Sequence, residues 1–209
     1  QMIEDPIPND ELFEENYIEG LTIVGKKICI LLDSSSSMTD EKLLEIIKRK
    51  NLSEEEKKKG PKWKRSLDIV KWILVRAPKD SDIAVIRFSE TAKYIAKESF
   101  QTKNKNDLKT IFLGLNNIIP NGPTNLLSAL IQAAKFKPTN IYLITDGLPT
   151  FGGERFKSLN PFNQCDSIIG SSNKISGECR VKLFNQSIKY VSNNGCLLYT
   201  SDAADDDHC

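Results

Sequence analysis

Hydrophobic and polar positions follow two kinds of pattern along the chain. Three short, continuous apolar runs are typical of strands that are buried on both faces. They are residues 26–32 (KKICILL), 82–89 (DIAVIRFS) and 140–145 (NIYLIT). Residues 91–97 (TAKYIAK) are expected to pair beside the second run as an edge strand. These runs predict a sheet whose central strands are covered on both sides.

The segments between the apolar runs carry apolar residues at helical spacing. The clearest stripe lies in residues 61–76 and consists of Trp63, Leu67, Val70 and Leu74. The same periodicity predicts helices over residues 39–50, 106–118, 124–136 and 178–191. In the last of these, the aligned residues are Val181, Phe184, Ile188 and Val191.

Helix boundaries are marked by capping residues in the basic segment between the first two helices. Ser53 and Glu56 have the spacing of a capping box, which predicts a short additional helix. Gly60 fits the end of that helix, and Pro61 fits the first position of the next one.

Buried strands that alternate with amphipathic helices predict an α/β fold with a doubly wound, mostly parallel sheet and helices on both faces. Such sheets bind ligands outside the carboxyl ends of their strands. This rule selects three places in the chain, which are residues 33–37, 89–90 and 146–151.

Composition divides the chain into three segments. Residues 1–20 hold seven acidic residues and no Lys or Arg, which predicts an acidic lead-in or linker. Residues 21–195 are expected to form one domain. Residues 196–209 are interpreted as a non-native tail, because CLLYTSDAADD (196–206) resembles the in-frame translation of a sequencing adapter. We therefore expect a fragment whose domain is truncated at its C-terminal end, with an upstream signal or anchor left open.

The net charge of +1 hides a basic segment, residues 41–66, with ten Lys or Arg against five Glu. A solvated surface is the simplest interpretation, and docking of the acidic lead-in on this segment is the alternative. Nucleic-acid binding is not expected, because Trp63 is the only aromatic residue in the segment and no nucleic-acid motif is present.

The five cysteines do not indicate a zinc site, because there is no C-x-x-C motif and no Cys/His cluster. Cys29 lies inside an apolar run and is expected to be a buried thiol. Cys165 and Cys179 flank a polar loop, and whether they form a disulfide stays open. The only histidine, His208, lies in the tail.

Three oxygen-bearing residues, Asp33, Ser35 and Ser37, follow the first buried strand with the spacing D-x-S-x-S. In an extended loop alternate side chains point the same way, so one carboxylate and two hydroxyls would converge. Mg²⁺ prefers six hard oxygen ligands and retains several waters. Neutral hydroxyls leave such an ion short of negative charge, so it would take an anionic ligand from outside.

The pattern resembles the metal-ion-dependent adhesion site of von Willebrand factor type A domains. That family has D-x-S-x-S, then T, then D, and the matching residues here are Asp33, Ser35, Ser37, Thr124 and Asp146. The resemblance covers about residues 21–195. It implies that the three hydroxyls bind Mg²⁺ (or Mn²⁺) directly, while the two aspartates act largely through waters.

Each of these residues also has a purely structural interpretation. Pro123 departs from the small residue that the family usually places before the threonine, and Thr124 could serve only as a helix N-cap. Asp146 could only turn the chain with Gly147. A plain flexible loop is the alternative for the serines. In the metal interpretation Ser34 and Ser36 point away from the ion and support the loop through hydrogen bonds. Trp63 and Trp72 are expected to pack in the core.

A finer resemblance is to bacterial envelope-type proteins with this domain. In those proteins RRRNL…PKW follows the metal loop and TDGLPT follows the aspartate, whereas this chain has KRKNL…PKW and TDGLPT. Many of them carry an upstream membrane anchor. A location in the cell envelope or anchored to a membrane is therefore expected, with the cytoplasm as the alternative, and membrane contact is expected only through such an anchor.

The resemblance implies a non-catalytic, divalent-cation-dependent protein-binding domain, in which an Asp or Glu of a protein partner completes the metal shell. An enzyme is not expected, because no histidine base remains outside the tail and no G-x-S-x-G or Walker A motif is present. A Mg²⁺-dependent phosphohydrolase is disfavoured, since a serine stands where its general acid would be. A subunit that partners an AAA+ ATPase or an envelope complex remains the alternative.

Overall fold

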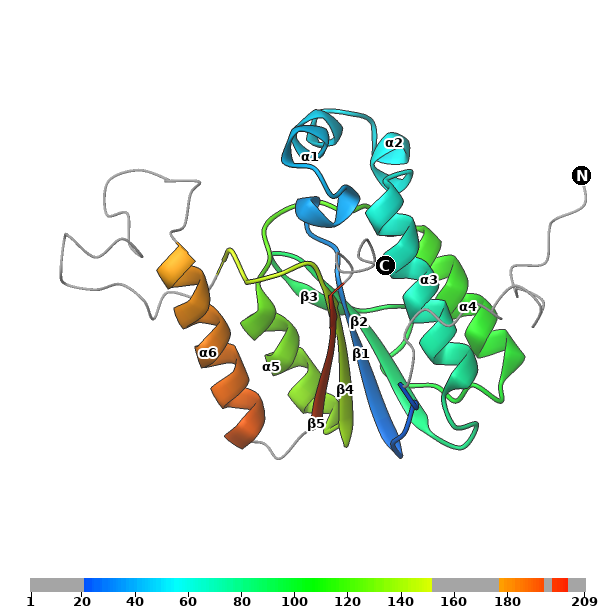
Figure 1. Cartoon of the computed structure of the whole chain (residues 1–209). Coiled ribbons are helices and arrows are strands. Elements are labelled where there is room, and N and C mark those ends of the chain that lie inside the picture. The colour runs from blue at the N-terminus through cyan, green and yellow to red at the C-terminus, as the bar shows by residue number, and fades with distance from the viewer. Residues whose placement is uncertain (1–20, 152–176, 194–196, 203–209) are drawn as a thin grey trace, which may run out of the picture.

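The computed structural model describes residues 21–151, 177–193 and 197–202 (Figure 1). Its centre is a five-stranded sheet in the order β3-β2-β1-β4-β5. The strands are β1 (Lys27–Asp33), β2 (Asp82–Phe88), β3 (Ala92–Tyr94), β4 (Asn140–Thr145) and β5 (Leu197–Asp202). All neighbours are parallel except β3, which runs antiparallel to β2 at one edge. The predicted fold class is confirmed.

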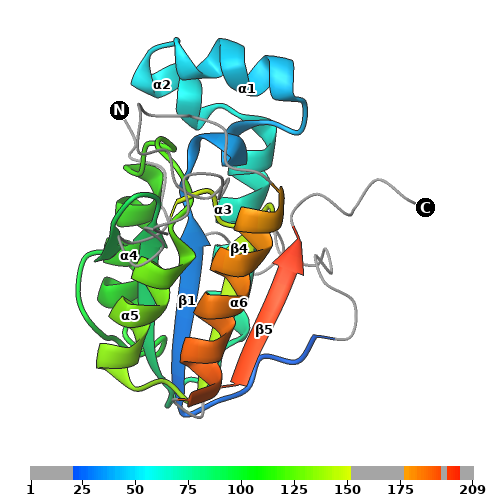
Figure 2. The same cartoon turned by 90° about the vertical axis from the view of Figure 1, so that its left-hand side faces the viewer.

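Helices cover both faces of the sheet. On one face lie α3 (Pro61–Arg76) and α4 (Lys105–Asn116), and on the other α5 (Leu126–Phe136) and α6 (Gly177–Asn193), which stand in front of the sheet in Figure 2. Three short elements lie beyond the carboxyl end of β1, at the top of Figure 1. They are the 3-10 helix η2 (Ser36–Thr39), α1 (Leu43–Lys50) and α2 (Glu54–Lys58).

The continuous apolar run of β1 is explained by a core on each side of the sheet. Ile28, Ile30 and Leu32 pack in the cluster with α3 and α4, and Cys29 and Leu31 pack in the cluster with α5. Successive residues of a strand point to opposite faces, so a strand covered on both sides needs apolar residues throughout. The predicted stripe of α3 is buried, as are Trp63 and Trp72, and the thiol of Cys29 is free and buried.

The predicted helix boundaries between α1 and α3 are confirmed. The Ser53 hydroxyl accepts a hydrogen bond from the Glu56 N–H at the start of α2, and Pro61 is the first residue of α3. The helix predicted from residue 39 begins only at Leu43, because η2 and an extended Asp40 precede it.

The inward face of α6 differs in part from the predicted stripe. Phe184 of the stripe packs against the core, but Val181 is exposed, and Cys179, Leu183 and Ser187 are buried. The helix packs beside α5 and in front of the sheet, with its Cys179–Leu183–Ser187 side turned inward. Cys179 is disulfide-bonded, and Cys165, the partner considered above, lies outside the described residues.

The segment interpreted as a non-native tail contributes β5, which pairs in parallel with β4 from Asn140↔Leu197 to Thr145↔Asp202. Main-chain hydrogen bonds at a sheet edge do not depend on side-chain identity, so any extended segment can pair there. The origin of the tail therefore stays a prediction, as does the role of the acidic lead-in, which lies outside the described residues. None of the described helices is both long and apolar enough to span a bilayer.

Candidate metal site

Three loops meet at the carboxyl ends of β1 and β4. The first begins at the last residue of β1 (residues 33–37), the second precedes α5 (residues 121–125) and the third begins at the last residue of β4 (residues 145–147). The strands β1 and β4 are parallel neighbours, with Leu32 opposite Ile144, so their last residues lie side by side. The fold thus brings Asp33 and Asp146 together across 113 positions of sequence.

Asp33 is fully buried at the end of β1. Its Oδ1 atom accepts a hydrogen bond from the Ser35 N–H (2.8 Å), and its Oδ2 atom accepts one from the Thr145 hydroxyl (2.8 Å). Burial is the main cause that raises the pKa of Asp33 to about 7, and the nearby charge of Asp146 raises it further, while the hydrogen bonds oppose the shift. Without a bound metal, the negative charge of the ionised Asp33 carboxylate is therefore poorly compensated.

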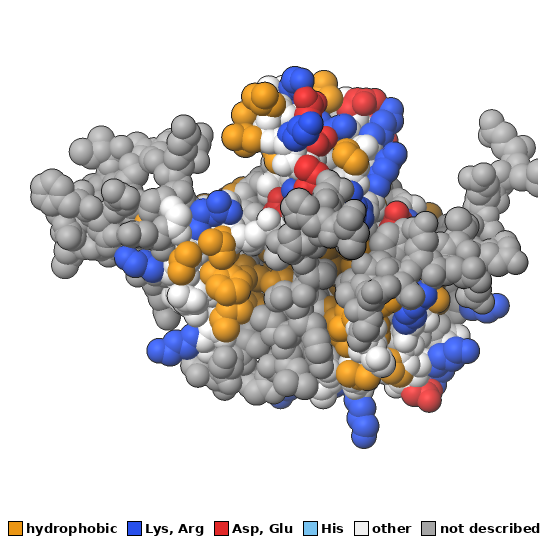
Figure 3. Space-filling view, in the orientation of Figure 1, with side chains coloured by type: hydrophobic (Ala, Val, Ile, Leu, Met, Phe, Trp, Pro, Cys, Tyr) orange, Lys and Arg blue, Asp and Glu red, His pale blue; other side chains and the backbone are white. Residues whose placement is uncertain are grey.

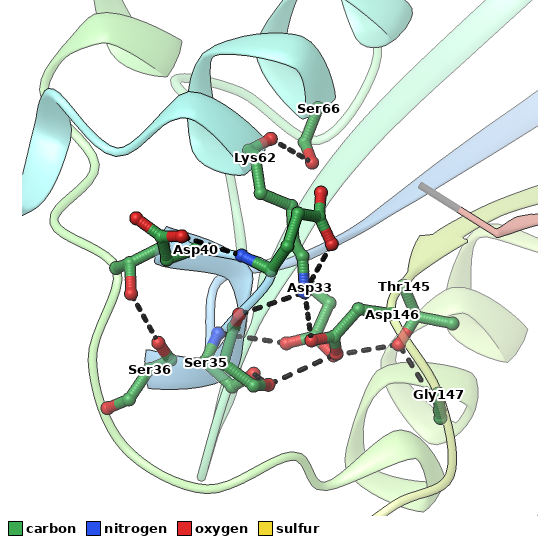
Figure 4. A network of polar contacts seen from close by, with 12 residues as sticks. Asp33, Ser35, Ser36, Asp40, Lys62, Ser66, Thr145, Asp146 and Gly147 are labelled. Carbon is green, nitrogen blue, oxygen red and sulfur yellow. Dashed lines mark hydrogen bonds and ion pairs between the residues drawn. The ribbon is translucent and has the colours of Figure 1, made fainter. Parts of the chain in front are cut away.

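The alternate serines face the aspartates. The hydroxyls of Ser35 and Ser37 are 3.0 Å apart, and the Ser37 hydroxyl donates to the Oδ1 atom of Asp146 (3.1 Å). Figure 4 shows Asp33, Thr145 and Asp146 next to Ser35 in this network. Four of the five predicted site residues, Asp33, Ser35, Ser37 and Asp146, therefore belong to one hydrogen-bonded set, which Asp33 joins through the Ser35 N–H.

The other two serines hold the loop in place, as predicted. Both the N–H and the hydroxyl of Ser34 donate to the Phe88 carbonyl at the end of β2 (2.7 and 2.9 Å). The N–H of Ser36 donates to the Gly122 carbonyl, and its hydroxyl accepts from the Gly122 N–H, both at 3.0 Å. The serine loop is therefore fixed to β2 and to the loop before α5, so the flexible-loop interpretation is wrong.

Thr124 lies in the loop that Ser36 binds, two residues after Gly122. The interpretation of Thr124 as the N-cap of α5 is wrong, because Asn125 caps this helix by accepting from the Ser128 N–H (3.1 Å). Thr124 is 4% exposed, and its hydroxyl makes no hydrogen bond to any residue that the structure describes. Its ligation of a metal stays a prediction that this uncommitted hydroxyl permits.

A lysine that the motif did not indicate completes the site. Lys62, in the first turn of α3, is 4% exposed. Its ammonium lies 3.0 Å from Asp146 Oδ2, 3.3 Å from the Ser37 carbonyl oxygen and 3.4 Å from Glu41 Oε2. In Figure 4 it extends from α3 toward Asp146. The sequence contains no clear signal for it, because only the structure shows that Lys62 and Ser66 lie on the inward side of α3, where lysine is rarely found.

The donor set fits a hard divalent cation. It combines hydroxyls with two carboxylates, which suits Mg²⁺ or Mn²⁺ better than zinc. Within the described ranges, no three His, Cys, Asp or Glu side chains gather as a metal cluster. The site already attracts positive charge, because the Lys62 ammonium is held there by oxygen atoms of three different residues.

Comparison with known proteins identifies the fold. No protein-family model matches the sequence, and no curated protein matches it. A von Willebrand factor type A structure from Catenulispora acidiphila is 13% identical with a TM-score of 0.50, and the match covers 84% of this chain and 32% of that one. The chain thus spans about a third of that protein. The described residues have the von Willebrand factor type A fold.

Two other solved structures are similar at lower scores. The PilB minor pilin from Streptococcus sanguinis is 14% identical over 88% of this chain and 58% of its own, with a TM-score of 0.48. Proximal thread matrix protein 1 from the mussel byssus is 16% identical over 85% of this chain and 37% of its own, with a TM-score of 0.49.

Proposed function

We propose that this domain binds a protein partner through a divalent cation, Mg²⁺ or Mn²⁺, and that an Asp or Glu of the partner completes the cation's shell. The observation that supports this most directly is the hydrogen-bonded set of Asp33, Ser35, Ser37 and Asp146 at the ends of two neighbouring strands, in which Asp33 is joined through the Ser35 N–H. Residues far apart in sequence converge there in the order of the adhesion-site motif.

The site residues would have two roles, direct ligation of the ion and compensation of its charge through bound waters. Ser35, Ser37 and Thr124 would hold the ion through neutral hydroxyls, and Asp33 and Asp146 would hold its waters. The bound cation supplies a positive charge that an external carboxylate can neutralise. Since Asp33 is fully buried, its charge is poorly solvated, and a cation beside it would compensate that charge.

The proposed role is non-catalytic. The chemistry of the site supports this, because hydroxyls and carboxylates surround a lysine that is engaged with Asp146, and the described residues contain no histidine to act as a base. A location in the cell envelope accords with the finer sequence resemblance and stays a prediction. A role as an assembly subunit also stays a prediction, because no contact among the described residues favours it.

Metal binding is tested by titrating Mg²⁺ into chelator-treated protein while thermal unfolding is followed. A ligand that binds only the folded state stabilises it by about 1.4 kcal/mol at roughly ten times its Kd. We expect a rise in Tm at millimolar Mg²⁺ that Asp33→Ala abolishes. The control Asp68→Ala removes a carboxylate of α3 that is paired with Lys71, and it should leave the rise intact. No rise in the wild type would overturn the proposal.

The partner's carboxylate is tested separately with glutarate as a small probe. Repeating the titration with excess sodium glutarate, against sodium chloride of equal ionic strength, should tighten the apparent Mg²⁺ affinity if the bound ion accepts a carboxylate. Equal affinities in the two salts would leave a metal site without the proposed ligand chemistry.

A further inference from the structure

The helix α1 presents its apolar side to solvent. Leu43 and Leu44 are 70% and 71% exposed, Ile47 is 51% exposed, and none of the helix's residues is buried. The spacing of 43, 44 and 47 places these three side chains on one face. Hydrophobic side chains accordingly gather over α1 at the top of Figure 3. An amphipathic helix normally turns this face inward, so its exposure here requires an explanation.

The orientation of α1 is set by a polar anchor on its opposite side. Arg49 binds Asp40 through its Nε atom (3.2 Å) and donates from Nη1 to the Glu56 carbonyl (3.2 Å). The side chains of Arg49 and Asp40 are 22% and 13% exposed, so the pair is shielded from water. Because this anchor joins α1 to both the preceding loop and α2, the apolar face is held outward.

The same segment is attached rigidly to the candidate metal site. Only residues 38–42 separate Ser37 from α1, and Met38 and Thr39 among them are buried. Figure 1 places α1 above the carboxyl ends of the strands, at the end of the molecule where the site lies. The exposed helix and the candidate site therefore lie at the same end of the molecule.

The charge around the exposed face favours an acidic partner. Lys48 pairs with Glu45 (2.6 Å), and the neighbouring Glu41 pairs with Lys62 and Arg65. Lys42 and Lys50 are exposed and make no ion pair with any residue that the structure describes, so they supply the remaining positive charge beside the face. A surface of aliphatic and basic side chains complements a segment with acidic and aliphatic residues. The eight residues of α1 extend about 12 Å, which about four residues of an extended peptide would span.

We propose that the exposed face of α1 (Leu43, Leu44 and Ile47) docks the partner segment whose carboxylate enters the metal site. The partner is a protein segment with an Asp or Glu that has aliphatic side chains beside it in the sequence. The metal site captures the carboxylate, and α1 selects the residues beside it. This inference rests on the proposed function and adds the surface that determines which acidic segment binds.

The test selects the ligand from a library of linear twelve-residue peptides. Peptides bound to the wild type in Mg²⁺ are eluted with EDTA, and the most enriched one is synthesised for measurement of Kd. The docking variant is Leu43→Gln/Leu44→Gln/Ile47→Gln, which retains residues of good helix propensity. The matched control is Leu113→Gln/Ile131→Gln, two residues of α4 and α5 that are 49% and 43% exposed.

We expect an enriched peptide with aliphatic residues beside an acidic one. It should bind the docking variant at least tenfold more weakly than the wild type, and the control variant as tightly as the wild type. The Mg²⁺-dependent rise in Tm of the docking variant should equal that of the wild type, since no substituted residue is buried. Asp33→Asn should abolish peptide binding.

Several results would overturn the docking proposal while the proposed function stands. One is equal affinity for the docking variant and the wild type, and another is a normal Mg²⁺ response with no peptide eluted by EDTA. Two further results would assign the face to another occupant. The first is flotation of the wild type with phosphatidylcholine–phosphatidylglycerol vesicles, which would indicate a lipid surface. The second is dimerisation of the wild type, which would indicate a second copy of the chain. Each would have to be independent of Mg²⁺ and lost in the docking variant. By contrast, a wild type without a Mg²⁺ response would overturn the proposed function itself.

Discussion

The ammonium of Lys62 lies 3.0 Å from the Oδ2 atom of Asp146, while the Oδ1 atom of the same carboxylate accepts the Ser37 hydroxyl. One carboxylate is therefore shared between a built-in cation and the predicted metal ligands. Lys62 holds Asp146 in place when no metal is bound. The same positive charge would repel an entering divalent cation, so under the proposed function Lys62 would both order the site and limit its metal affinity.

Replacing Lys62 with Met should strengthen metal binding and weaken the metal-free fold. Loss of the repulsive charge should increase Mg²⁺ affinity by about tenfold or more, which corresponds to about 1.4 kcal/mol. Loss of the partner of Asp146 should lower the stability of the chelated protein, by up to about 3 kcal/mol, because the carboxylate is largely buried. Isothermal titration with Mg²⁺ and denaturant unfolding in EDTA measure the two effects.

The matched control is Lys64→Met, two positions along α3, where the side chain is exposed. It removes the same charge from the protein but not from the site, and both quantities should stay near their wild-type values. If the variants at 62 and 64 had the same Mg²⁺ affinity, Lys62 would not limit metal binding.

The raised pKa of Asp33 predicts how the metal-free protein responds to pH. The carboxyl releases its proton at about 7 in the folded state and at about 3.8 in the unfolded state. Between these values the folded state binds more protons, so stability falls as pH rises from about 4 to 7, by about 4 kcal/mol for a group titrating alone. Asp33→Asn should flatten this dependence in EDTA. Saturating Mg²⁺ should flatten it in the wild type, which unfolding curves at several pH values would show.

The hydroxyl of Thr124 offers a way to separate ligation from support. Thr124→Val keeps the shape of the side chain and removes a hydroxyl that makes no hydrogen bond within the described part of the chain. We expect little change in stability in EDTA and a weaker Mg²⁺ response. Ser34→Ala should do the reverse, because it removes a buried hydrogen bond to Phe88, worth about 1 kcal/mol, and no predicted ligand. A Thr124→Val protein with the full Mg²⁺ response would remove Thr124 from the ligand set.

Much of the fold could be predicted because local patterns and packing agree. The run in β1 indicated burial on both faces, and the capping box at Ser53 and Glu56 marked α2. The inward face of α6 was not predictable in this way. Its periodicity offers more than one apolar face, and packing beside α5 buries Cys179 and Leu183 in place of Val181.

The site shows the same division between motif and tertiary structure. The motif placed Asp33, Ser35 and Ser37 together, but the expected extended loop ends at Ser35. Ser37 lies in the 3-10 helix η2 and reaches Asp146 from that turn. The motif did not indicate Lys62, whose role depends on how α3 lies against η2. The sequence also did not show whether Thr124 or Asn125 caps α5, because either residue type can cap a helix. The structure shows that Asn125 does.

The contact between Gly60 and Thr39 positions Lys62 and is open to a steric test. A Cβ atom at Gly60 would overlap the Thr39 carbonyl oxygen, so only glycine lets the start of α3 pack this closely on η2. The backbone angles of Gly60 are accessible to alanine, so the effect of Gly60→Ala is steric rather than conformational. We expect a loss of about 1–3 kcal/mol in stability.

The same substitution should also change metal binding. Because α3 would shift away from η2, Lys62 should withdraw from Asp146 and Mg²⁺ affinity should rise, as in Lys62→Met. The control Gly177→Ala lies at the start of α6, where no atom of the described residues is near the added Cβ, and it should not lower stability or change Mg²⁺ affinity. Lower stability with an unchanged Mg²⁺ affinity would show that the position of Lys62 does not depend on this contact.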